Sequence, residues 1–370
     1  MNITLLSGLI FVGVFAGVVL IHEFGHFLAA RLLNVDVEEF GIGLPPRALT
    51  LFHWKGTDFT LNWLPLGGFV RPKGENDPDV AGGLAASSPW VRLGVLFAGP
   101  IMNLLAAVVV NSMLFAQVGV PDMTRVMLYE ITPDSPAAQA GLLADDFVLA
   151  VDGEQVTNDD QFRTLIQANL DQPMQLTVQR GDETLELTAT PLSSRTVEEG
   201  ALGIIPGPPM VEPKSFIQTI PYGAMYTYSQ ARQIISLPVM IIRNQISSEE
   251  GRFVGLKGIY DLFGQAVSRD VQSREAAPPV VAEAPPVEPT NFTLQIIASL
   301  TLTLGIFNLL PFPALDGGRI LFVLPELIFR RRVPPQFENV VHAVGFALLI
   351  GFMIYINAMD FINPVNFTLP

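Results

Sequence analysis

The sequence predicts a polytopic α-helical membrane protein with about four transmembrane helices, an inserted α+β domain and a membrane-associated β-hairpin. Three observations lead to this fold class. Of the 370 residues, 49% are hydrophobic and 15% are charged, and the mean hydropathy of +0.41 is high for a soluble enzyme of this size. Four apolar runs each approach the roughly 20 residues that cross a hydrocarbon core. Acidic residues are concentrated between the second and third runs.

The four apolar runs cover residues 3–21, 95–118, 292–310 and 340–356. Buried helices of a soluble protein are the alternative, but four such runs in one chain favour membrane spans. The first run has neither a basic start nor a small-residue cleavage site. It is therefore expected to stay in the mature protein rather than act as a signal peptide.

Basic residues predict the topology, because short loops rich in Lys and Arg stay in the cytoplasm. Between the first and second runs lie Arg31, Arg47, Lys55, Arg71, Lys73 and Arg92, and between the third and fourth lie Arg330, Arg331 and Arg332. Both chain ends and the acidic domain are then expected outside the cytoplasm. The first and third spans run in the same direction, from outside to inside.

The membrane core is expected in two parts. The first part covers residues 1–118, with spans at 3–30 and 95–118 and a β-hairpin at 57–73. The second part covers residues 292–357, with spans at 292–324 and 338–357. Each span is an apolar run together with its polar helical extension.

Three segments lie between these two parts. Residues 121–192 alternate like strands around one helical stretch and form an acidic α+β domain, which excludes a nucleic-acid footprint. Residues 214–275 have amphipathic helical character. Residues 276–290 form a proline-rich linker that cannot be helical.

A metal in this chain must be held by His, Asp or Glu, because there is no cysteine. His22-Glu23-Phe24-Gly25-His26 places two imidazoles four residues apart on one helix face, with a carboxylate between them. Both imidazoles can bind one Zn²⁺ ion, and Glu23 can be the general base for a water molecule that zinc activates. The alternative is that these residues only mark a helix end. Ionisable groups within an apolar span are rarely without function, which favours the metal site.

A catalytic zinc ion needs a third protein ligand and one open position. Asp316 is the best candidate, because it lies about as deep in the third span as His22 lies in the first. Pro311 and Pro313 indicate that the third helix is broken before Asp316. Irregular backbone at membrane depth is tolerated only inside protein or at a cavity, where an active site would lie.

Asp316 followed by Gly317 also fits a simple turn at a helix end. His53 and His342 are isolated in the sequence, and both are interpreted as interfacial or packing residues.

In its motifs and their order, the chain resembles the site-2 protease family of intramembrane zinc metalloproteases, in particular the bacterial branch that resembles the regulator of sigma-E protease and cleaves anti-sigma factors. The features that carry the resemblance are residues 22–26, 65–70 and 98–103, an inserted PDZ-like domain, and residues 308–318. The resemblance implies that His22, His26 and Asp316 bind zinc and that Glu23 is the catalytic base. It also implies that Asn308 positions substrate or stabilises the oxyanion; the alternative is that Asn308 hydrogen-bonds the broken helix.

Residues 61–71 resemble the family's membrane-entering β-hairpin. Their apolar alternation and a turn at Gly67-Gly68 would place an open strand edge beside the zinc. A substrate in extended form could then pair with Gly67, Gly68 and Phe69 by β-addition. An ordinary cytoplasmic hairpin is the alternative.

Residues 135–142 and 151–153 resemble PDZ signatures, so this domain is expected to filter substrates or to bind a peptide end or a partner. Asp145 departs from the glycine that the family often has before its acidic residue, which puts the turn there and carboxylate binding in doubt. Arg319 departs from the histidine of many relatives.

These features predict an intramembrane zinc endopeptidase that cuts single-span membrane proteins, such as anti-sigma factors or signal-peptide remnants, in regulated intramembrane proteolysis. The expected location is the bacterial inner membrane, with the active site near the cytoplasmic side. A catalytically silent scaffold is one alternative, but it has no chemical need for Glu23. A zinc transporter is another, but the second and fourth spans lack the repeated polar positions of a transport path.

Overall fold

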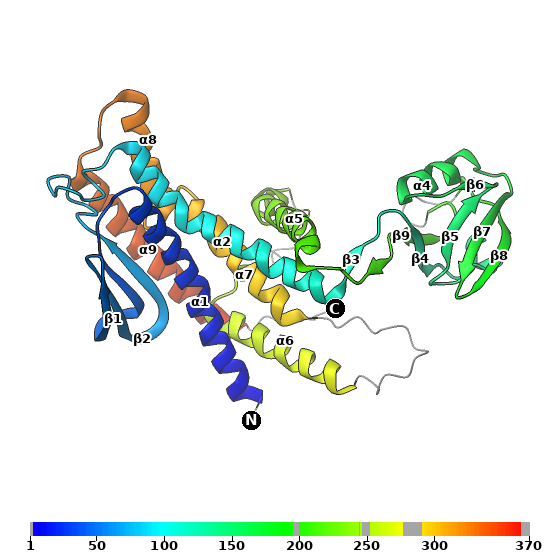
Figure 1. Ribbon diagram of the computed structural model, residues 1–370, viewed down its shortest axis with the longest axis horizontal. Coiled ribbons are helices and arrows are strands. Elements are labelled where there is room, and N and C mark those ends of the chain that lie inside the picture. The colour runs from blue at the N-terminus through cyan, green and yellow to red at the C-terminus, as the bar shows by residue number, and fades with distance from the viewer. Residues whose placement is uncertain (1–2, 195–199, 244, 246–251, 277–290, 364–370) are drawn as a thin grey trace. The chain divides into compact units, whose positions relative to one another are not determined.

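The computed structural model describes residues 3–194, 200–243, 245, 252–276 and 291–363. The chain forms two compact units (Figure 1). Unit 1 comprises Met1–Phe115 and Thr219–Pro370, and unit 2 comprises Ala116–Gln218. The predicted metal-binding, catalytic and substrate-positioning residues all fall in unit 1.

Four helices of the described chain are long and apolar enough to cross a membrane, which confirms the expected number. They are α1 (Ile3–Leu32), α2 (Pro89–Val118), α7 (Phe292–Leu309) and α9 (Pro335–Ile362). The expected third span at 292–324 is not continuous, because α7 ends at Leu309 and α8 begins at Asp316 and continues to Phe329.

The non-helical segment between α7 and α8 has a clear cause in the sequence. Pro311 and Pro313 have no backbone N–H to continue a helix, and Ala314 adopts a φ of 77°, in the left-handed region that side chains disfavour. Asp316 therefore stands in the first turn of a new helix, where a carboxylate interacts favourably with the helix dipole.

A sheet of two long strands packs on α1 (Figure 1). Strand β1 covers Val37–Trp54 and β2 covers Thr57–Pro72. Glu39 lies opposite both Asp58 and Arg71, so the first half of β1 is flanked by both ends of β2. The end of β2 that follows Gly67 is thereby left as an edge segment beside α1.

The turn of this sheet lies at Lys55 and Gly56 rather than at Gly67-Gly68, which corrects the expected hairpin at 57–73. Gly67 lies inside β2 with a φ of 85° and bends the strand there. A Cβ on Gly67 would lie 3.1 Å from Val19, and one on Gly68 would lie 2.6 Å from Leu20. The two glycines thus allow β2 to approach α1 closely, and they are buried by that contact.

Helix α5 (Phe216–Ile242) packs against α2 through small and polar groups. Asn111 donates to the hydroxyl of Thr227 at 2.8 Å and to the side-chain carbonyl of Gln230 at 3.1 Å. A Cβ on Gly223 would lie 2.3 Å from the Ser112 hydroxyl. Such contacts are typical of helix packing in membranes.

Two carboxylates, one on α9 and one on α6 itself, connect α6 to its neighbouring helices. Helix α6 covers Leu256–Ala276. Asp360 of α9 accepts from the backbone N–H groups of Gly255 and Gly258, at 2.8 and 3.0 Å. Asp270 of α6 accepts from the first amides of α7, those of Phe292 and Thr293, both at 2.9 Å. The amphipathic region expected at 214–275 is thus two helices, α5 and α6.

Unit 2 contains a six-stranded sheet in the order β8-β7-β5-β4-β9, with β6 paired to β5. Its strands are β4 (Val126–Ile131), β5 (Phe147–Val151), β6 (Glu154–Gln155), β7 (Met174–Arg180), β8 (Glu183–Ala189) and β9 (Ile204–Gly207). A separate pair joins β3 (Val120–Pro121) to β10 (Met210–Val211). The unit therefore extends beyond residue 192, where the sequence placed its end.

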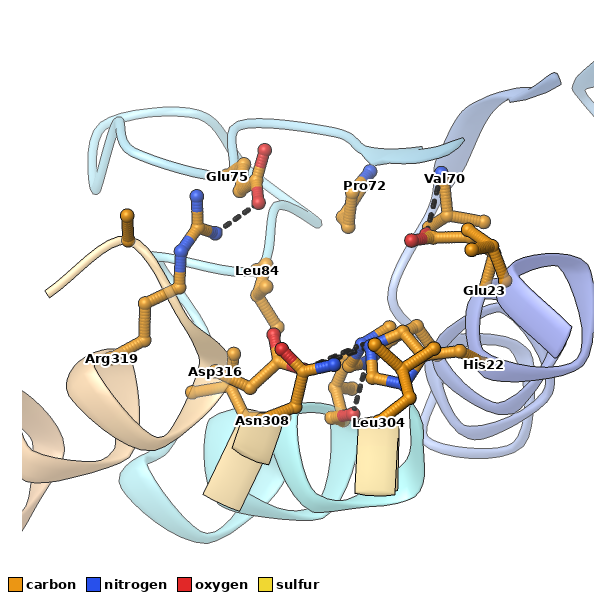
Figure 2. Close-up of a pocket in the computed structure, with 15 residues that line it drawn as sticks. His22, Glu23, Val70, Pro72, Glu75, Leu84, Leu304, Asn308, Asp316 and Arg319 are labelled. Carbon is orange, nitrogen blue, oxygen red and sulfur yellow. Dashed lines mark hydrogen bonds and ion pairs between the residues drawn. The ribbon is translucent and has the colours of Figure 1, made fainter. Parts of the chain in front are cut away.

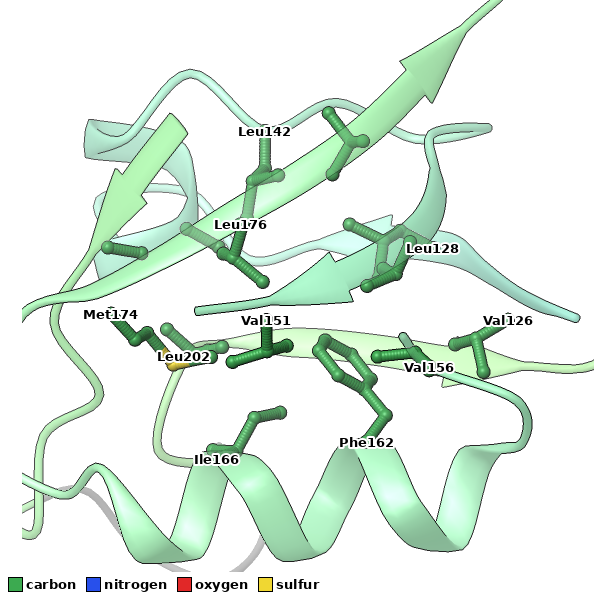
Figure 3. Close-up of a cluster of buried hydrophobic side chains, with 14 residues drawn as sticks. Val126, Leu128, Leu142, Val151, Val156, Phe162, Ile166, Met174, Leu176 and Leu202 are labelled. Atoms are coloured by element: carbon green, nitrogen blue, oxygen red, sulfur yellow. The ribbon is translucent and has the colours of Figure 1, made fainter. Parts of the chain in front are cut away.

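The core of unit 2 lies between this sheet and helix α4 (Asp159–Ala168), while the short helix α3 (Pro136–Gln139) follows β4. Figure 3 shows Phe162 and Ile166 of α4 pointing at Val151 and Leu176 of the sheet. Asp146 is fully buried and pairs with Arg180 at 2.7 Å. The Arg180 guanidinium thereby compensates the charge of the buried Asp146 carboxylate.

Candidate metal centre

Helices α1 and α8 bring the three expected metal ligands together (Figure 2). The Nε2 atoms of His22 and His26 are 3.1 Å apart. Asp316 Oδ2 lies 3.0 Å from Nε2 of His22 and 3.3 Å from Nε2 of His26. Both imidazoles are buried, and the carboxylate is largely covered.

This arrangement fits a tetrahedral zinc ion. Zinc bonds of about 2.0–2.1 Å to nitrogen and oxygen imply ligand atoms about 3.3 Å from one another, close to the three distances observed. Asp316 Oδ2 is buried and accepts no well-formed hydrogen bond from the described residues. A buried carboxylate oxygen without a donor is expensive unless a cation satisfies it.

The second nitrogen of His26 is held by the backbone of α2. Its Nδ1 donates to the carbonyl oxygen of Val95 at 2.8 Å, which leaves Nε2 unprotonated and able to bind a metal. A Cβ on Gly99 would lie 2.3 Å from His26 Nε2, and one on Gly25 would lie 2.4 Å from the carbonyl of Ala98. The two glycines thus let α2 lie directly against the metal-binding face of α1.

Asn103 of α2 faces the second nitrogen of His22. The amide nitrogen is 3.4 Å from His22 Nδ1, whereas the amide oxygen is buried and has no partner among the described residues. When Nε2 binds a metal, Nδ1 carries the proton and needs an acceptor. Exchanging the two atoms of the Asn103 amide supplies that acceptor at the same place, and such an assignment is made from the hydrogen-bond network.

Glu23 lies beside the three ligands. Its Oε2 accepts from the backbone N–H of Val70, at 3.0 Å, on the edge segment of β2 (Figure 2). The carboxylate faces the same cavity as the metal-binding nitrogens. A general base at hydrogen-bonding reach of a metal-activated water must stand in such a position.

The cavity has a volume of about 280 Å³ and is lined from three of the candidate spans. Val19 of α1, Val95 of α2 and Leu304 of α7 form apolar walls, and Asn308 adds a polar group near the end of α7. Phe69, expected to contact substrate, is half-buried next to Val70. Gly67 and Gly68 do not line the cavity.

Gly317 and Gly318 explain how Asp316 reaches the histidines. A Cβ on Gly317 would lie 2.2 Å from the carbonyl oxygen of Leu310, and one on Gly318 would lie 2.3 Å from that of Phe312. Only glycines let the first turn of α8 fold back on the segment before it. Close packing therefore requires glycine at positions 317 and 318, next to the candidate metal ligand Asp316.

His342, Glu75 and Arg319 lie near the site, although the sequence predicted no catalytic or metal-binding role for them. His342 of α9 accepts the backbone N–H of Ala314 at 2.9 Å. Glu75, in the loop after β2, forms an ion pair with Arg319 of α8 at the cavity wall (Figure 2). His53 pairs with Asp58 at the exposed side of the sheet and does not approach the centre.

The comparison with protein families matches residues 10–352 to the model described as Peptidase family M50. A protein of Clostridium perfringens, which its name assigns provisionally to the zinc metalloproteases, is 31% identical over 342 residues, or 91% of this chain and 92% of its own. The zinc metalloprotease RasP of Oceanobacillus iheyensis is 28% identical over 430 aligned positions, covering 92% of this chain and 95% of RasP. RasP of Geobacillus kaustophilus is 26% identical, with 94% and 96% covered.

Proposed function

Because the chain belongs to peptidase family M50, the site-2 proteases, and is a zinc-dependent metalloprotease of the membrane, we propose that it is an intramembrane endopeptidase that cleaves single-span membrane proteins. One observation carries the proposal. Apolar residues of α1, α2 and α7 form walls of the cavity that is also lined by His22, Glu23, His26 and Asp316. A substrate segment from the bilayer would meet these walls directly.

The proposed reaction assigns one task to each group. His22, His26 and Asp316 hold zinc, which when bound supplies Lewis-acid activation of a water molecule and of the peptide carbonyl. Glu23 takes a proton from the attacking water and passes it to the leaving amine. Asn308, at the cavity wall, is proposed to donate to the developing oxyanion or to orient the substrate carbonyl.

The substrate must be extended to be cut, because a helical peptide bond is shielded and its carbonyl is already bonded. We propose that the edge of β2 near Phe69 and Val70 receives the extended segment by β-addition. The Val70 amide faces the catalytic carboxylate at 3.0 Å, so a strand paired here would lie beside the zinc. The buried Gly67 and Gly68 support this edge by allowing β2 to pack on α1.

Unit 2 is proposed to be a PDZ-like domain that filters substrates or binds a peptide end or partner. A cavity of about 380 Å³ lies between α4 and β9 and is lined by Arg163, Ile166 and Ile204. A groove between a helix and an edge strand, with one cation at its wall, fits an added peptide strand. Residues 135–142, which resemble a PDZ signature, include buried Ser135, Ala137 and Leu142.

The localisation proposed is the bacterial inner membrane, with both chain ends and unit 2 outside the cytoplasm and the centre near the cytoplasmic side. The basic residues between α1 and α2 and between α8 and α9 support it. A reporter enzyme fused after Pro370 is expected to be exported. A cytoplasmic signal would refute this topology.

The central experiment compares cleavage of a purified single-span membrane protein by wild type and Glu23→Gln in detergent or liposomes. Wild type is expected to cut within or beside the membrane segment, and both Glu23→Gln and a zinc chelator are expected to abolish the product. Glu38→Gln is the matched control, because Glu38 is exposed on β1. Equal cleavage by wild type and Glu23→Gln would refute the catalytic assignment, and cuts confined to soluble loops would refute the intramembrane one.

A further inference from the structure

The segment between α7 and α8 fixes where Asp316 stands. The N–H groups of Leu310, Phe312 and Leu315 donate to nearby backbone carbonyls, whereas that of Ala314 donates outside the segment. The segment contains Pro311 and Pro313, which offer no N–H, and it places Ala314 at a φ of 77°. A left-handed conformation costs a non-glycine residue about 1–3 kcal/mol and persists only where surrounding structure holds it. Something outside the segment must therefore keep it in place.

Helix α9 provides two contacts that do so. The N–H of Ala314 donates to Nδ1 of His342 at 2.9 Å. Three residues further on, Gly345 lies so close to Pro313 that a Cβ there would be 2.3 Å from the proline Cβ. Residues three apart lie on one helix face, so α9 presents a single surface to the segment.

The His342 ring packs against α8, with its centroid 5.4 Å from the ring of Phe322. Its buried Nε2 lies 3.9 Å from Glu338, beyond hydrogen-bond distance. Because Nδ1 accepts a hydrogen bond, the ring proton is on Nε2. His342 is thus a neutral acceptor between the ligand-bearing segment and the first part of α9.

Few residues of α9 are buried, and one of them lies at the contact with the segment between α7 and α8. Within the described chain, the fully buried residues of α9 are Gly345 and Asp360. Gly345 contacts the segment before Asp316, and Asp360 contacts the start of α6. Other residues of α9 are half-buried or exposed, and Phe337 contacts Phe322 of α8. The surface around His342 and Gly345 contacts the segment that leads to Asp316.

We propose that His342 is a positioning residue for the metal centre. By accepting the Ala314 N–H, it fixes the turn that carries Asp316 and so sets the approach of the Asp316 carboxylate to His22 and His26. His342 does not touch the metal or the substrate. The inference rests on the zinc site of the proposed function, but it concerns metal affinity and does not require cleavage.

The test measures zinc affinity by competition with a chromophoric chelator, using full-length protein purified in detergent. His342→Leu removes the acceptor and is expected to bind zinc about 10–100-fold more weakly, the usual effect of losing an outer-shell partner. His342→Asn places an oxygen near the former Nδ1 and is expected to restore most of the affinity. His342→Gln, whose oxygen lies one methylene further out, is expected to fall between them.

Asn357→Leu is the matched control on the same helix. Its side-chain oxygen accepts from the Lys257 N–H at 3.4 Å, at the other end of α9, so the variant loses an interhelical acceptor away from the metal. Its zinc affinity is expected to equal that of wild type. Wild-type affinity in His342→Leu, or equal losses in His342→Leu, His342→Asn and Asn357→Leu, would overturn the proposal. Failure of fully zinc-loaded wild type to cleave any single-span substrate would count against the proposed function alone, because the zinc affinities of the His342 variants do not depend on cleavage.

Discussion

The two units of the chain bury different kinds of residue. Unit 2 has one hydrophobic cluster among its described residues, which includes Phe162, Leu128 and Leu176 (Figure 3). Unit 1 has four smaller clusters and fully buries polar side chains such as Asn103 and Asn111 on a candidate span. The single apolar core of unit 2 is typical of a domain that folds in water. The several small clusters and buried asparagines of unit 1 are not.

The difference follows from the solvent of each unit. In water, burial of apolar surface drives a domain to fold. In a bilayer, lipid is as apolar as leucine, so helices associate through close packing and polar contacts. Polar residues of unit 1 should therefore decide the geometry of the site, while apolar residues of unit 2 should decide its stability.

The largest expected effect tests the polar side of this comparison. Asp316→Ala removes one of the three proposed zinc ligands and should lower zinc affinity more than about 100-fold, which exceeds the effect of losing a group that only hydrogen-bonds a ligand. Zinc content measured by atomic emission after gel filtration is expected to fall from one ion to almost none per chain. Unchanged stoichiometry would remove Asp316 from the site.

The next effect tests the apolar side. Phe162→Ala leaves a cavity under the sheet of unit 2 and should destabilise that unit by about 3–5 kcal/mol. Hydrogen exchange followed by mass spectrometry should show faster exchange in β5 and β7, with zinc content unchanged. Loss of zinc in this variant would show that the two units are not independent in stability.

A pair of variants on α2 sharpens the comparison within unit 1. Asn103→Leu removes the acceptor for His22 Nδ1 and should weaken zinc binding about 10–100-fold. Asn103→Asp keeps an acceptor and should bind zinc more tightly than Asn103→Leu. Equal zinc affinities of the two variants would contradict the assigned orientation of the Asn103 amide.

Asn111→Leu is the partner of that experiment, because Asn111 is equally buried on the same helix and bonds α5 instead of the centre. It should cost about 0.6–1.7 kcal/mol of helix association, seen as a small fall in thermal stability in detergent. Zinc affinity should not change. A fall in zinc affinity as large as that of Asn103→Leu would erase the distinction between the two asparagines.

The smallest effect concerns pH and unit 2. Hydrogen bonds from the Ser193 hydroxyl and backbone N–H lower the pKa of Asp171. A lowered folded-state pKa adds stability above the unfolded value of about 3.9, and that stability is lost as pH falls through the folded value. Asp171→Asn should therefore destabilise unit 2 slightly at pH 7 and match wild type in strong acid, as measured by hydrogen exchange.

The sequence was sufficient to predict four candidate spans, and it singled out His22, His26 and Asp316, which the structure brings together. Apolar length and helix spacing are local signals, so both can be read without tertiary contacts. The sequence placed the sheet turn wrongly at Gly67-Gly68, since a glycine pair marks a close approach to another element as readily as a turn. The contact with Val19 and Leu20 is not visible in local sequence.

His342 was interpreted as a packing residue because nothing beside it in the chain shows a partner. The hydrogen bond that gives it a role comes from Ala314, 28 residues away. The end of unit 2 was placed too early for a similar reason. Strand β9 is short and contains Pro206, so alternation alone could not reveal it.

The carboxylate of Asp360 connects the last turn of α9 to the first turn of α6 and to Arg252. Removing it would leave the amides of Gly255 and Gly258 without their acceptor and Arg252 without its ion pair. Tags, fusion partners and truncations designed for purification should therefore retain the chain through Asn363, whose carbonyl oxygen also accepts from Arg252. A shortened protein that purifies poorly would reflect a missing cap, not a missing catalytic group.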